Sequence, residues 1–367
     1  MVPLATGQQL AVPPFYCPIT MACAPNSTTV DHETVAWMKR LKLHESREQR
    51  DYQARTNYGG WACMTIPDGS QQRRQLFSDM TIWYLSVDDA FFDEAEDADD
   101  VDLLLLHLDR VLQIPDAATA GSDLWPIVGL RDLRQRIEQF TTTAQLQQWV
   151  STLRSCLMAA AHGASFRRQN PTQNLNDYVV LRLGEGGMWL VMAMIPIVGG
   201  YELTKAELTD PRVRALEDMA SFLPQWDNDI LGYAKETIRS ARYGYPPLSN
   251  VITILARENA CDINAAQHLA IMMRDRVMCR FIQLRERVLL DASANLARYV
   301  TGLGHFIRGY LEWARTTPRY TIATNPGDPA TIDPITMPTT WAQHPSDDSP
   351  DPLPIPAIAW WWQQGSE

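Results

Sequence analysis

The sequence predicts an all-α fold, in which packed helices surround one core. Apolar residues recur at helical spacing along most of the chain, and few segments show the alternation of a strand. The helical patterns run about 10–25 residues, the usual length of helices in globular proteins. Hydrophobic residues make up 46% of the 367 residues, which is enough for a substantial core. These observations together indicate a single-domain helical bundle.

The first half of the chain contains five expected helices and one apolar segment. Val35, Met38 and Leu41 recur at helical spacing, which predicts a helix over residues 34–43. The apolar segment, residues 61–66, precedes a turn of sequence Pro-Asp-Gly-Ser. The further helices are expected at 71–89, 101–112, 125–140 and 143–161.

The second half contains longer helices with two expected interruptions. Glycines at residues 184–187 should disturb the first of these helices, because glycine weakens a helix interior. Pro224 should separate two others, because proline lacks the N–H group that a helix needs. The expected helices are 175–198, 211–222, 225–241, 264–292 and 293–316.

Both ends of the chain differ from the helical body, residues 31–320. Residues 1–30 are rich in proline and polar residues, so we expect an irregular segment that wraps the body. Residues 321–367 contain nine prolines, which indicates irregular structure, with a disordered tail as the alternative. The tryptophans at 360–362 would expose a large apolar patch on a solvated tail. We therefore expect them to dock on the bundle, with residues 321–345 as a candidate lid over a central cavity.

Composition limits the partners and the compartment. The formal net charge of −11 argues against nucleic acid or an anionic membrane as the main partner. The six cysteines form no CxxC pair and no zinc-type spacing, which indicates free thiols in a reducing cytoplasm. We expect no signal peptide, because no basic region followed by an apolar run occurs near the start. The longest apolar run, residues 188–198, is shorter than the roughly 18–20 residues of a membrane span.

Three carboxylates stand in an apolar, aromatic segment at residues 82–94. Asp89 and Asp93 would share one face of a helix, and Asp88 would flank them. Such carboxylates are costly to bury unless a positive group compensates them. Clustered oxygen ligands suit a hard divalent cation, Mg²⁺ above all. The alternative is an acidic helix end that leads into an acidic loop.

A second stretch, residues 226–236, carries a complementary pattern. Asn228, Gly232 and Glu236 follow one another at four-residue spacing, so they would stack on one face of a helix. Lys235 stands beside them, and the amide and carboxylate offer further oxygen ligands. Mg²⁺ commonly shares its shell between carboxylates, waters and substrate phosphates, which makes a diphosphate the implied ligand.

The two motifs together resemble a known family. The sequence Asp-Asp-Ala-Phe-Phe-Asp at 88–93 and the sequence Asn-Asp-Ile-Leu-Gly-Tyr-Ala-Lys-Glu at 228–236 resemble the two metal motifs of class I terpene synthases. Arg182 resembles the diphosphate-sensing arginine, 46 residues (228 − 182) before the second motif. Arg319 and Tyr320 resemble an Arg-Tyr pair near the family's C-terminus. The resemblance covers most of the chain up to this pair and is closest to bacterial sesquiterpene cyclases such as selinadiene synthase. It implies a helical bundle with a central active-site cavity.

The resemblance also implies roles for the motif residues. Asp88, Asn228 and Glu236 would hold Mg²⁺, with three ions expected when diphosphate is bound. Asp89 and Asp93 would support the metal site or act as salt-bridge partners. The donors to the diphosphate would be Arg182, Lys235, Arg319 and Tyr320.

Gly232 departs from the family pattern, which usually has serine or threonine at this position. The glycine removes a hydroxyl ligand from one Mg²⁺ ion. We expect a water to fill the space that glycine leaves, since Mg²⁺ holds water readily. Weaker metal binding and an impaired enzyme are the alternatives.

The glycine-rich stretch after Arg182 matches a further feature of such enzymes. There, the sensing arginine is followed three and four residues later by an acidic residue and a glycine, and Glu185 and Gly186 match these positions. The resemblance implies that the carbonyl of Gly186 triggers ionisation at a helix break. The alternative is a kink that merely permits close packing.

The chemistry implied by the family requires a dry, electron-rich wall, since aromatic faces stabilise cations and exclusion of water prevents early quenching. The candidates are Trp61, Trp83, Phe306 and Trp313, and each could instead be plain core. The implied activity is ionisation of farnesyl diphosphate and cyclisation of the carbocation to a sesquiterpene. The alternatives are geranyl or geranylgeranyl diphosphate as substrate, and a catalytically silent relative that binds prenyl diphosphates. We also expect a homodimer, which is common among similar proteins.

Overall fold

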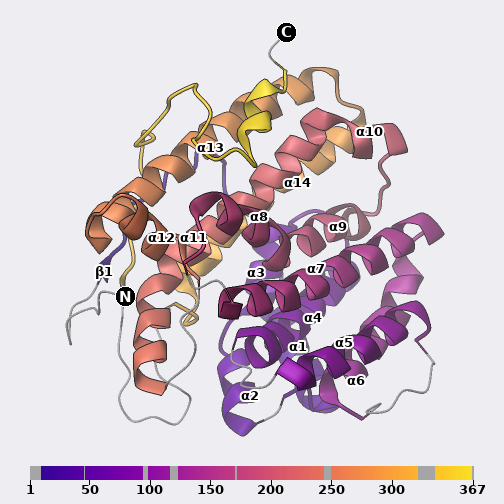
Figure 1. The fold of residues 1–367 in the computed structure, drawn as a ribbon. Coiled ribbons are helices and arrows are strands. Elements are labelled where there is room, and N and C mark those ends of the chain that lie inside the picture. The colour runs from indigo at the N-terminus through magenta and orange to yellow at the C-terminus, as the bar shows by residue number, and fades with distance from the viewer. Residues whose placement is uncertain are drawn as a thin grey trace.

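Helices build nearly all of the structure, a computed structural model, so the predicted all-α class is confirmed (Figure 1). The structure describes residues 10–44, 46–93, 98–115, 123–169, 172–243, 249–320 and 335–365. Within these residues the only sheet is a parallel pair of two-residue strands, β1 (Leu10–Ala11) and β2 (Ile335–Thr336).

The α-helices are α1 (Ser27–Leu41), α2 (Arg47–Gln53), α3 (Tyr58–Thr65), α4 (Gln71–Val87), α5 (Ala98–Gln113), α6 (Trp125–Ile137), α7 (Thr143–Gln169), α8 (Leu175–Glu185), α9 (Met188–Gly199), α10 (Lys205–Thr209), α11 (Pro211–Tyr243), α12 (Val251–Glu258), α13 (Ile263–Asp291) and α14 (Ala294–Thr316). Figure 1 shows the helices of the first half, in indigo and purple, on one side, and α11–α14 on the other. Helices α8 and α9 lie between these two groups.

Side-chain caps begin several of these helices where the sequence supplies a Ser, Asn or Asp. Asn174 accepts a hydrogen bond from the backbone N–H of Asp177 (2.9 Å) and thereby begins α8. Asp262 and Ser293 begin α13 and α14 in the same way. Such caps satisfy backbone N–H groups that the first turn of a helix leaves without a partner.

Three expectations about element boundaries were wrong, and one apolar segment received its secondary structure only from the structure. Helix α1 begins at Ser27, inside the segment 1–30 that the composition predicts to be irregular. Pro224 lies within a single helix, α11, instead of separating two helices. Helices α2, α10 and α12 were not anticipated, because each is short: 7, 5 and 8 residues. The apolar segment 61–66 is mostly helix α3.

The neighbours of Pro224 explain why α11 continues through it. Proline donates no backbone hydrogen bond, which leaves the carbonyl of Ala220, four residues earlier, without its helical donor. The side-chain amide of Gln225 donates to the carbonyl of Ser221 (3.2 Å) and to its hydroxyl (2.9 Å), which adds contacts in the same turn but does not replace that bond. The segment around Pro224 is also buried on both sides, so packing holds it helical despite the local cost.

One stretch is long and apolar enough to cross a membrane by composition alone. It spans Leu175–Gly199, and 50% of its most apolar window is buried inside the bundle. The helix is interrupted within this stretch at Gly187, whose φ of 70° belongs to the left-handed region. The two helices on either side of this break, α8 and α9, contribute to the core, which fits a pair of core helices in a folded bundle.

The C-terminal strap, which we define as residues 335–365, lies on α13. Ser346 donates from its backbone and its hydroxyl to Asp275 (2.9 and 2.8 Å). Arg276 pairs with Asp347 through its Nε at 2.9 Å. The strap also pairs with the N-terminal segment, where the N–H of Ala342 donates to the carbonyl of Phe15 (3.0 Å). The proposed lid, residues 321–345, lies largely outside the described residues.

Trp361 anchors the end of the strap. Its side chain is fully buried (0% exposed), and its ring packs edge-on against Phe222 of α11 at a centroid distance of 5.7 Å. Its indole N–H donates to Asp218 of α11 (3.1 Å), and Arg280 of α13 donates to its carbonyl. Trp362 stacks on it and is half-buried. The strap therefore ties α11 to α13.

We expect Trp361→Ala to lower the free energy of unfolding by about 3–5 kcal/mol, because the change opens a cavity in a packed interior. Urea unfolding followed by circular dichroism measures this loss. Trp362→Ala is the matched control, and its cost should be smaller because part of that ring is already exposed. Equal losses for the two variants would contradict this description of the strap.

Candidate active site

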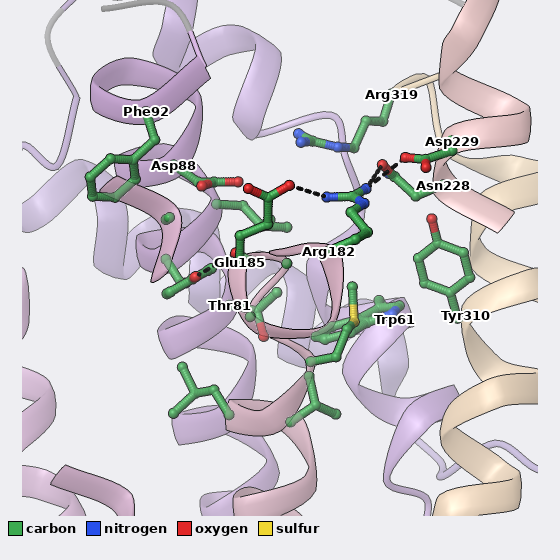
Figure 2. Close-up of a pocket in the computed structure, with 18 of the residues that line it drawn as sticks. Trp61, Thr81, Asp88, Phe92, Arg182, Glu185, Asn228, Asp229, Tyr310 and Arg319 are labelled. Carbon is green, nitrogen blue, oxygen red and sulfur yellow. Dashed lines mark hydrogen bonds and ion pairs between the residues drawn. The ribbon is translucent and has the colours of Figure 1, made fainter. Parts of the chain in front are cut away.

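A cavity lies between α3, α4, α8, α9, α11 and α14 (Figure 2). It contains about 1100 Å³ of space free of atoms, its opening to solvent included. One part is lined by charged and polar groups and the other by apolar and aromatic ones. We call the first part the polar mouth and define it by Asp88, Arg182, Glu185, Asn228, Asp229, Glu236, Arg319 and Tyr320.

Asp88 enters the polar mouth from a π-helix, η1 (Asp88–Asp93), which follows α4 without a break. The sequence predicts an ordinary helix up to residue 89, so the wider π turn is a correction. A π-helix inserts extra residues into a turn and often marks a functional site. Figure 2 shows Asp88 and Asn228 on opposite sides of the mouth, with Glu185 and Arg182 between them. Asp93 ends η1, and its side chain lies outside the described ones.

Arg182 crosses the mouth from α8 to α11. Its guanidinium donates to the amide oxygen of Asn228 and to the carboxylate of Asp229, both at 2.9 Å. It also lies 3.8 Å from the carboxylate of Glu185, one turn along α8. Its Nε is buried and makes no hydrogen bond within the described part of the chain. The guanidinium therefore keeps one donor available to a ligand.

Arg319 forms a two-pronged ion pair with Asp89. The two guanidinium nitrogens donate to the two carboxylate oxygens at 3.1 and 2.9 Å. Gln53 of α2 donates to the same carboxylate at 3.0 Å. Asp89 thus makes the salt bridge expected of it, and this pair holds Arg319 at the polar mouth. Asp89 does not line the cavity within the described residues.

Tyr320 and Asn228 are joined by a hydrogen bond at the edge of the mouth. The amide of Asn228 donates to the hydroxyl of Tyr320 (2.7 Å), which in turn contacts the hydroxyl of Tyr310 (2.5 Å). Burial raises the pKa of Tyr320 and that of Tyr310, so both hydroxyls stay protonated at neutral pH. The ammonium of Lys235 lies 5.9 Å from the centre of the Tyr320 ring. Lys235 is next to the mouth but does not line the cavity within the described residues.

Glu236 completes the oxygen donors on the α11 side. One of its oxygens accepts a hydrogen bond from Asn250 (3.1 Å), and the other faces Gly232. A Cβ on residue 232 would lie 2.4 Å from that second oxygen. The carboxylate of Glu236 therefore lies against the point where a side chain of residue 232 would begin, and the water expected there with bound Mg²⁺ stays a prediction.

The break between α8 and α9 falls at Gly186 and Gly187. A Cβ on residue 186 would lie 2.0 Å from the side-chain oxygen of Gln225, so any other residue would force the Gln225 side chain to shift. A Cβ on residue 187 would meet the ring of Tyr84 at 2.5 Å, and the φ of 70° also favours glycine. Gly186 lines the cavity, so the helix break predicted from the glycines faces the polar mouth.

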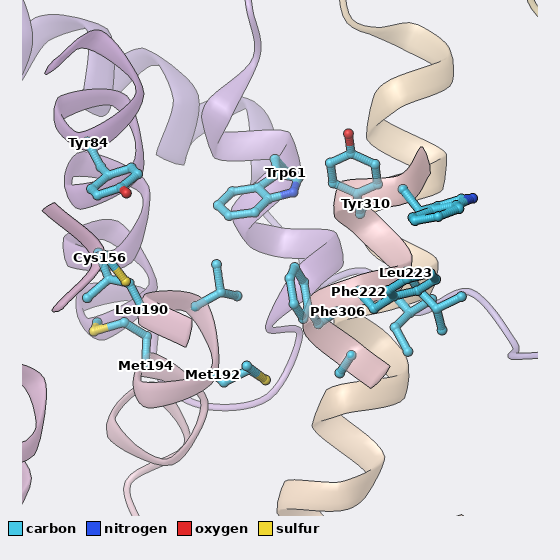
Figure 3. Close-up of a cluster of buried hydrophobic side chains, with 14 of the residues drawn as sticks. Trp61, Tyr84, Cys156, Leu190, Met192, Met194, Phe222, Leu223, Phe306 and Tyr310 are labelled. Carbon is cyan, nitrogen blue, oxygen red and sulfur yellow. The ribbon is translucent and has the colours of Figure 1, made fainter. Parts of the chain in front are cut away.

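The other part of the cavity is an apolar chamber, which we define by Trp61, Met80, Leu190, Val191 and Trp313. Figure 3 shows Trp61 between Tyr84 on one side and Tyr310 on the other. The rings of Trp61 and Trp313 lie 6.1 Å apart and are tilted by 57°.

Two of the four predicted aromatic residues lie elsewhere. Trp83 faces α6, where its indole N–H donates to the carbonyl of Pro126 (2.9 Å) and its ring packs on Gly129. Phe306 is fully buried in the apolar cluster of Figure 3 and does not line the cavity within the described residues. Trp83 is a core residue because it faces α6, and Phe306 is a core residue because it is buried beside the chamber without lining the cavity.

Several residues of the site were not predicted from the sequence. Tyr310 lies on the same face of α14 as Phe306 and Trp313, four residues after the first and three before the second. This helical spacing could have identified it. Asn250 caps α12, and the pattern of Asn before the apolar run Val-Ile-Thr-Ile-Leu is a usual helix start. No signal in the sequence pointed to its contact with Glu236.

The donor set of the mouth suits a hard cation. Asp88, Asn228 and Glu236 present carboxylate and amide oxygens to one cavity, and such oxygens are what Mg²⁺ prefers. Among the described residues, no three His, Cys, Asp or Glu side chains gather closely enough to hold a metal alone. A cation here would share its shell with waters and an anionic ligand, and the available donor of Arg182 fits the same anion.

Comparison with known proteins matches this site to one family. Residues 79–279 match the family model described as "Terpene synthase family 2, C-terminal metal binding". Bonnadiene synthase of Allokutzneria albata is 34% identical, over 97% of this chain and 99% of its own. The "(+)-T-muurolol synthase ((2E,6E)-farnesyl diphosphate cyclizing)" of Streptomyces clavuligerus is 30% identical, over 95% of this chain and 81% of its own. These matches do not test the nearer likeness to selinadiene synthase, which stays a prediction.

A solved structure has the same fold over nearly the whole chain. The crystal structure of the SVS_A2 protein from ancestral sequence reconstruction superposes with a TM-score of 0.81. It is 29% identical in sequence and covers 96% of this chain and 98% of its own. The superposition includes both helical groups of Figure 1, so the cavity lies in the same architecture.

We expect Asp89→Ala to lower the free energy of unfolding by about 3–5 kcal/mol, because it leaves the buried Arg319 without its ionic partner. Urea unfolding at neutral pH measures the loss. Asp291→Ala is the control: it removes an exposed partner of Arg212 and should change stability little. If the two variants were equally stable, the ion pair of Asp89 would not hold the mouth together.

Proposed function

Because this chain belongs to terpene synthase family 2, we propose that it ionises farnesyl diphosphate and cyclises the resulting cation to a sesquiterpene. The observation that carries this proposal is a single cavity with two different ends. Its polar mouth offers oxygen donors and arginines to a diphosphate, and its apolar chamber offers aromatic walls to a hydrocarbon chain. A prenyl diphosphate has the same two parts.

The choice of farnesyl diphosphate rests on the relatives. The T-muurolol synthase of Streptomyces clavuligerus is named for cyclising this diphosphate, and it matches 95% of this chain. Geranyl and geranylgeranyl diphosphates carry the same head group on a shorter or longer chain. The length of the apolar chamber decides between them, so all three are arms of the experiment below.

The matched family is a metal-binding one, so the site takes a divalent metal. We infer that the metal is Mg²⁺, held by Asp88 on one wall and by Asn228 and Glu236 on the other. With diphosphate bound, three Mg²⁺ ions would be coordinated by these three side chains together with phosphate oxygens and waters. When bound, Mg²⁺ would neutralise negative charge on the departing diphosphate.

The cationic side chains of the mouth orient the diphosphate. Asn228 and Asp229 hold the guanidinium of Arg182 in place, and its Nε–H, which has no acceptor among the described residues, is a donor for a phosphate oxygen. Arg319 is held in the same way by Asp89. Charge-assisted hydrogen bonds from fixed guanidinium groups are strong and directional, which suits a group that gains charge as it leaves.

The helix break places a backbone carbonyl near the head group. Gly186 lines the mouth between Arg182 and the start of α9, and its conformation frees peptide groups from the helical ladder. A carbonyl dipole there would stabilise positive charge on the allylic carbon as the bond to diphosphate breaks. A side chain at position 186 would displace the side chain of Gln225, which packs against this break.

The apolar chamber shelters the cation after the diphosphate has left. Trp61 and Trp313 offer ring faces to positive charge, and aliphatic side chains exclude water that would quench it. The chamber has no histidine or free carboxylate lining among the described residues, so the departed diphosphate or a backbone carbonyl serves as the final proton acceptor.

Incubation with Mg²⁺ and each of geranyl, farnesyl and geranylgeranyl diphosphate tests this function directly. We expect a cyclic sesquiterpene from farnesyl diphosphate, identified by mass spectrometry. A cyclic product from another chain length would correct the substrate. Absence of product from all three would favour a catalytically silent relative that only binds prenyl diphosphates.

Asp88→Ala should reduce turnover at least about 10²-fold, because it removes an oxygen donor that stabilises the leaving group's charge. Release of inorganic diphosphate measures the rate. Asp102→Ala, which removes an exposed carboxylate on α5, is the control and should leave the rate unchanged. Equal rates for the Asp88 variant and the wild type would exclude Asp88 from the site.

A further inference from the structure

Asn250 uses the two ends of its amide for two different tasks. Its side-chain oxygen accepts from the backbone N–H of Ile252 (2.9 Å) and thereby caps α12. Its side-chain nitrogen donates to the carbonyl of Asp229 (2.9 Å) and to the carboxylate of Glu236 (3.1 Å) on α11. A flipped amide would place its oxygen against two acceptors, so the network itself determines the orientation. Asn250 is 2% exposed and is therefore held firmly.

This contact sets the direction of the Glu236 carboxylate. Glutamate has several rotatable bonds, so a free carboxylate on α11 would sample many positions. With one oxygen held by Asn250, the other is directed over Gly232, 2.4 Å from the point where a Cβ would stand. The absence of a side chain at Gly232 is what makes this position possible, because any Cβ would collide with that oxygen.

We propose that Asn250 is a positioning residue of the metal site. Asn250 holds the Glu236 carboxylate over Gly232. The carboxylate then supplies an oxygen on the face of α11 where residue 232 has no side chain. This inference rests on the proposed function, in which Glu236 is a Mg²⁺ ligand. Asn250 touches neither the metal nor the substrate in this arrangement. Asn250 acts through Glu236, and the missing side chain at Gly232 leaves room for the Glu236 carboxylate.

The arrangement reverses a simple expectation about Gly232. Serine at this position would add a hydroxyl donor for Mg²⁺ and would be expected to improve metal binding. In this chain, however, the Cβ of serine would push the Glu236 carboxylate away from Asn250. Gly232→Ser should therefore weaken metal binding, and it should do so only while Asn250 holds Glu236.

Calorimetric titration of inorganic diphosphate into the protein with Mg²⁺ tests the proposal without any turnover. Asn250→Ser keeps a side-chain oxygen that can cap α12 but cannot reach Glu236, and we expect roughly 10- to 100-fold weaker binding. Asn250→Asp keeps the size and the cap but replaces the donor by an acceptor, and its binding should fall at least as far. Asn259→Ser, at the exposed far end of the same helix, is the matched control and should bind as the wild type does.

The double variant decides whether Asn250 acts through Glu236. Gly232→Ser should cost less affinity in the Asn250→Ser background than in the wild type, because Glu236 is no longer held there. Equal costs in both backgrounds, or unchanged binding in both Asn250 variants, would overturn the proposal and leave the proposed function standing. A wild-type protein that binds no diphosphate with Mg²⁺ would overturn both. Thermal unfolding of each variant shows whether a loss of binding comes from loss of the fold instead.

Discussion

Arg182 joins the two helices on which the polar mouth depends. It extends from α8 to Asn228 and Asp229 of α11, so the position of the proposed ligands on α11 is linked to the helix break that follows Arg182. Arg319 makes the corresponding link on the other side of the mouth, where it pairs with Asp89 of η1. Each cation is paired with a carboxylate, because an unpaired charge so deep in a bundle would be very costly.

The charge of the protein and its proposed ligand are in apparent conflict. A chain with a net charge of −11 should repel a diphosphate. The mouth itself has two arginines but four carboxylates, so divalent cations held by its oxygens would have to supply the positive charge that a diphosphate needs. Local charge therefore decides what the site can bind, while the charge of the whole surface governs solubility.

The motifs predicted much of the site because their residues follow helical spacing. Residues at that spacing lie on the same face of a helix. Asn228, Gly232 and Glu236 are an example, and the expectation that they lie on one helix is met by α11. Trp83 was misassigned because spacing along α4 does not say which neighbour each face meets. Asn250 was missed because its role depends on a tertiary contact between α12 and α11, which no local pattern records.

Elements were predicted well where packing and local preference agree, and poorly where packing overrides preference. Pro224 should end a helix, but burial of the segment on both sides of it keeps α11 continuous. The glycines at 186 and 187 should break a helix, and they do, because close contacts with Gln225 and Tyr84 also require it. The π turn of η1 has no simple sequence signature, and it alters the direction in which the acidic motif enters the cavity.

The central claim is that one mouth holds both the metal and the diphosphate. A crystal structure with Mn²⁺ and inorganic diphosphate, collected with anomalous scattering to locate the metal, tests it most directly. Metal peaks between Asp88 and the pair Asn228 and Glu236, with diphosphate within hydrogen-bond reach of Arg182 and Arg319, would support the claim. Metal or diphosphate bound outside this mouth would contradict it.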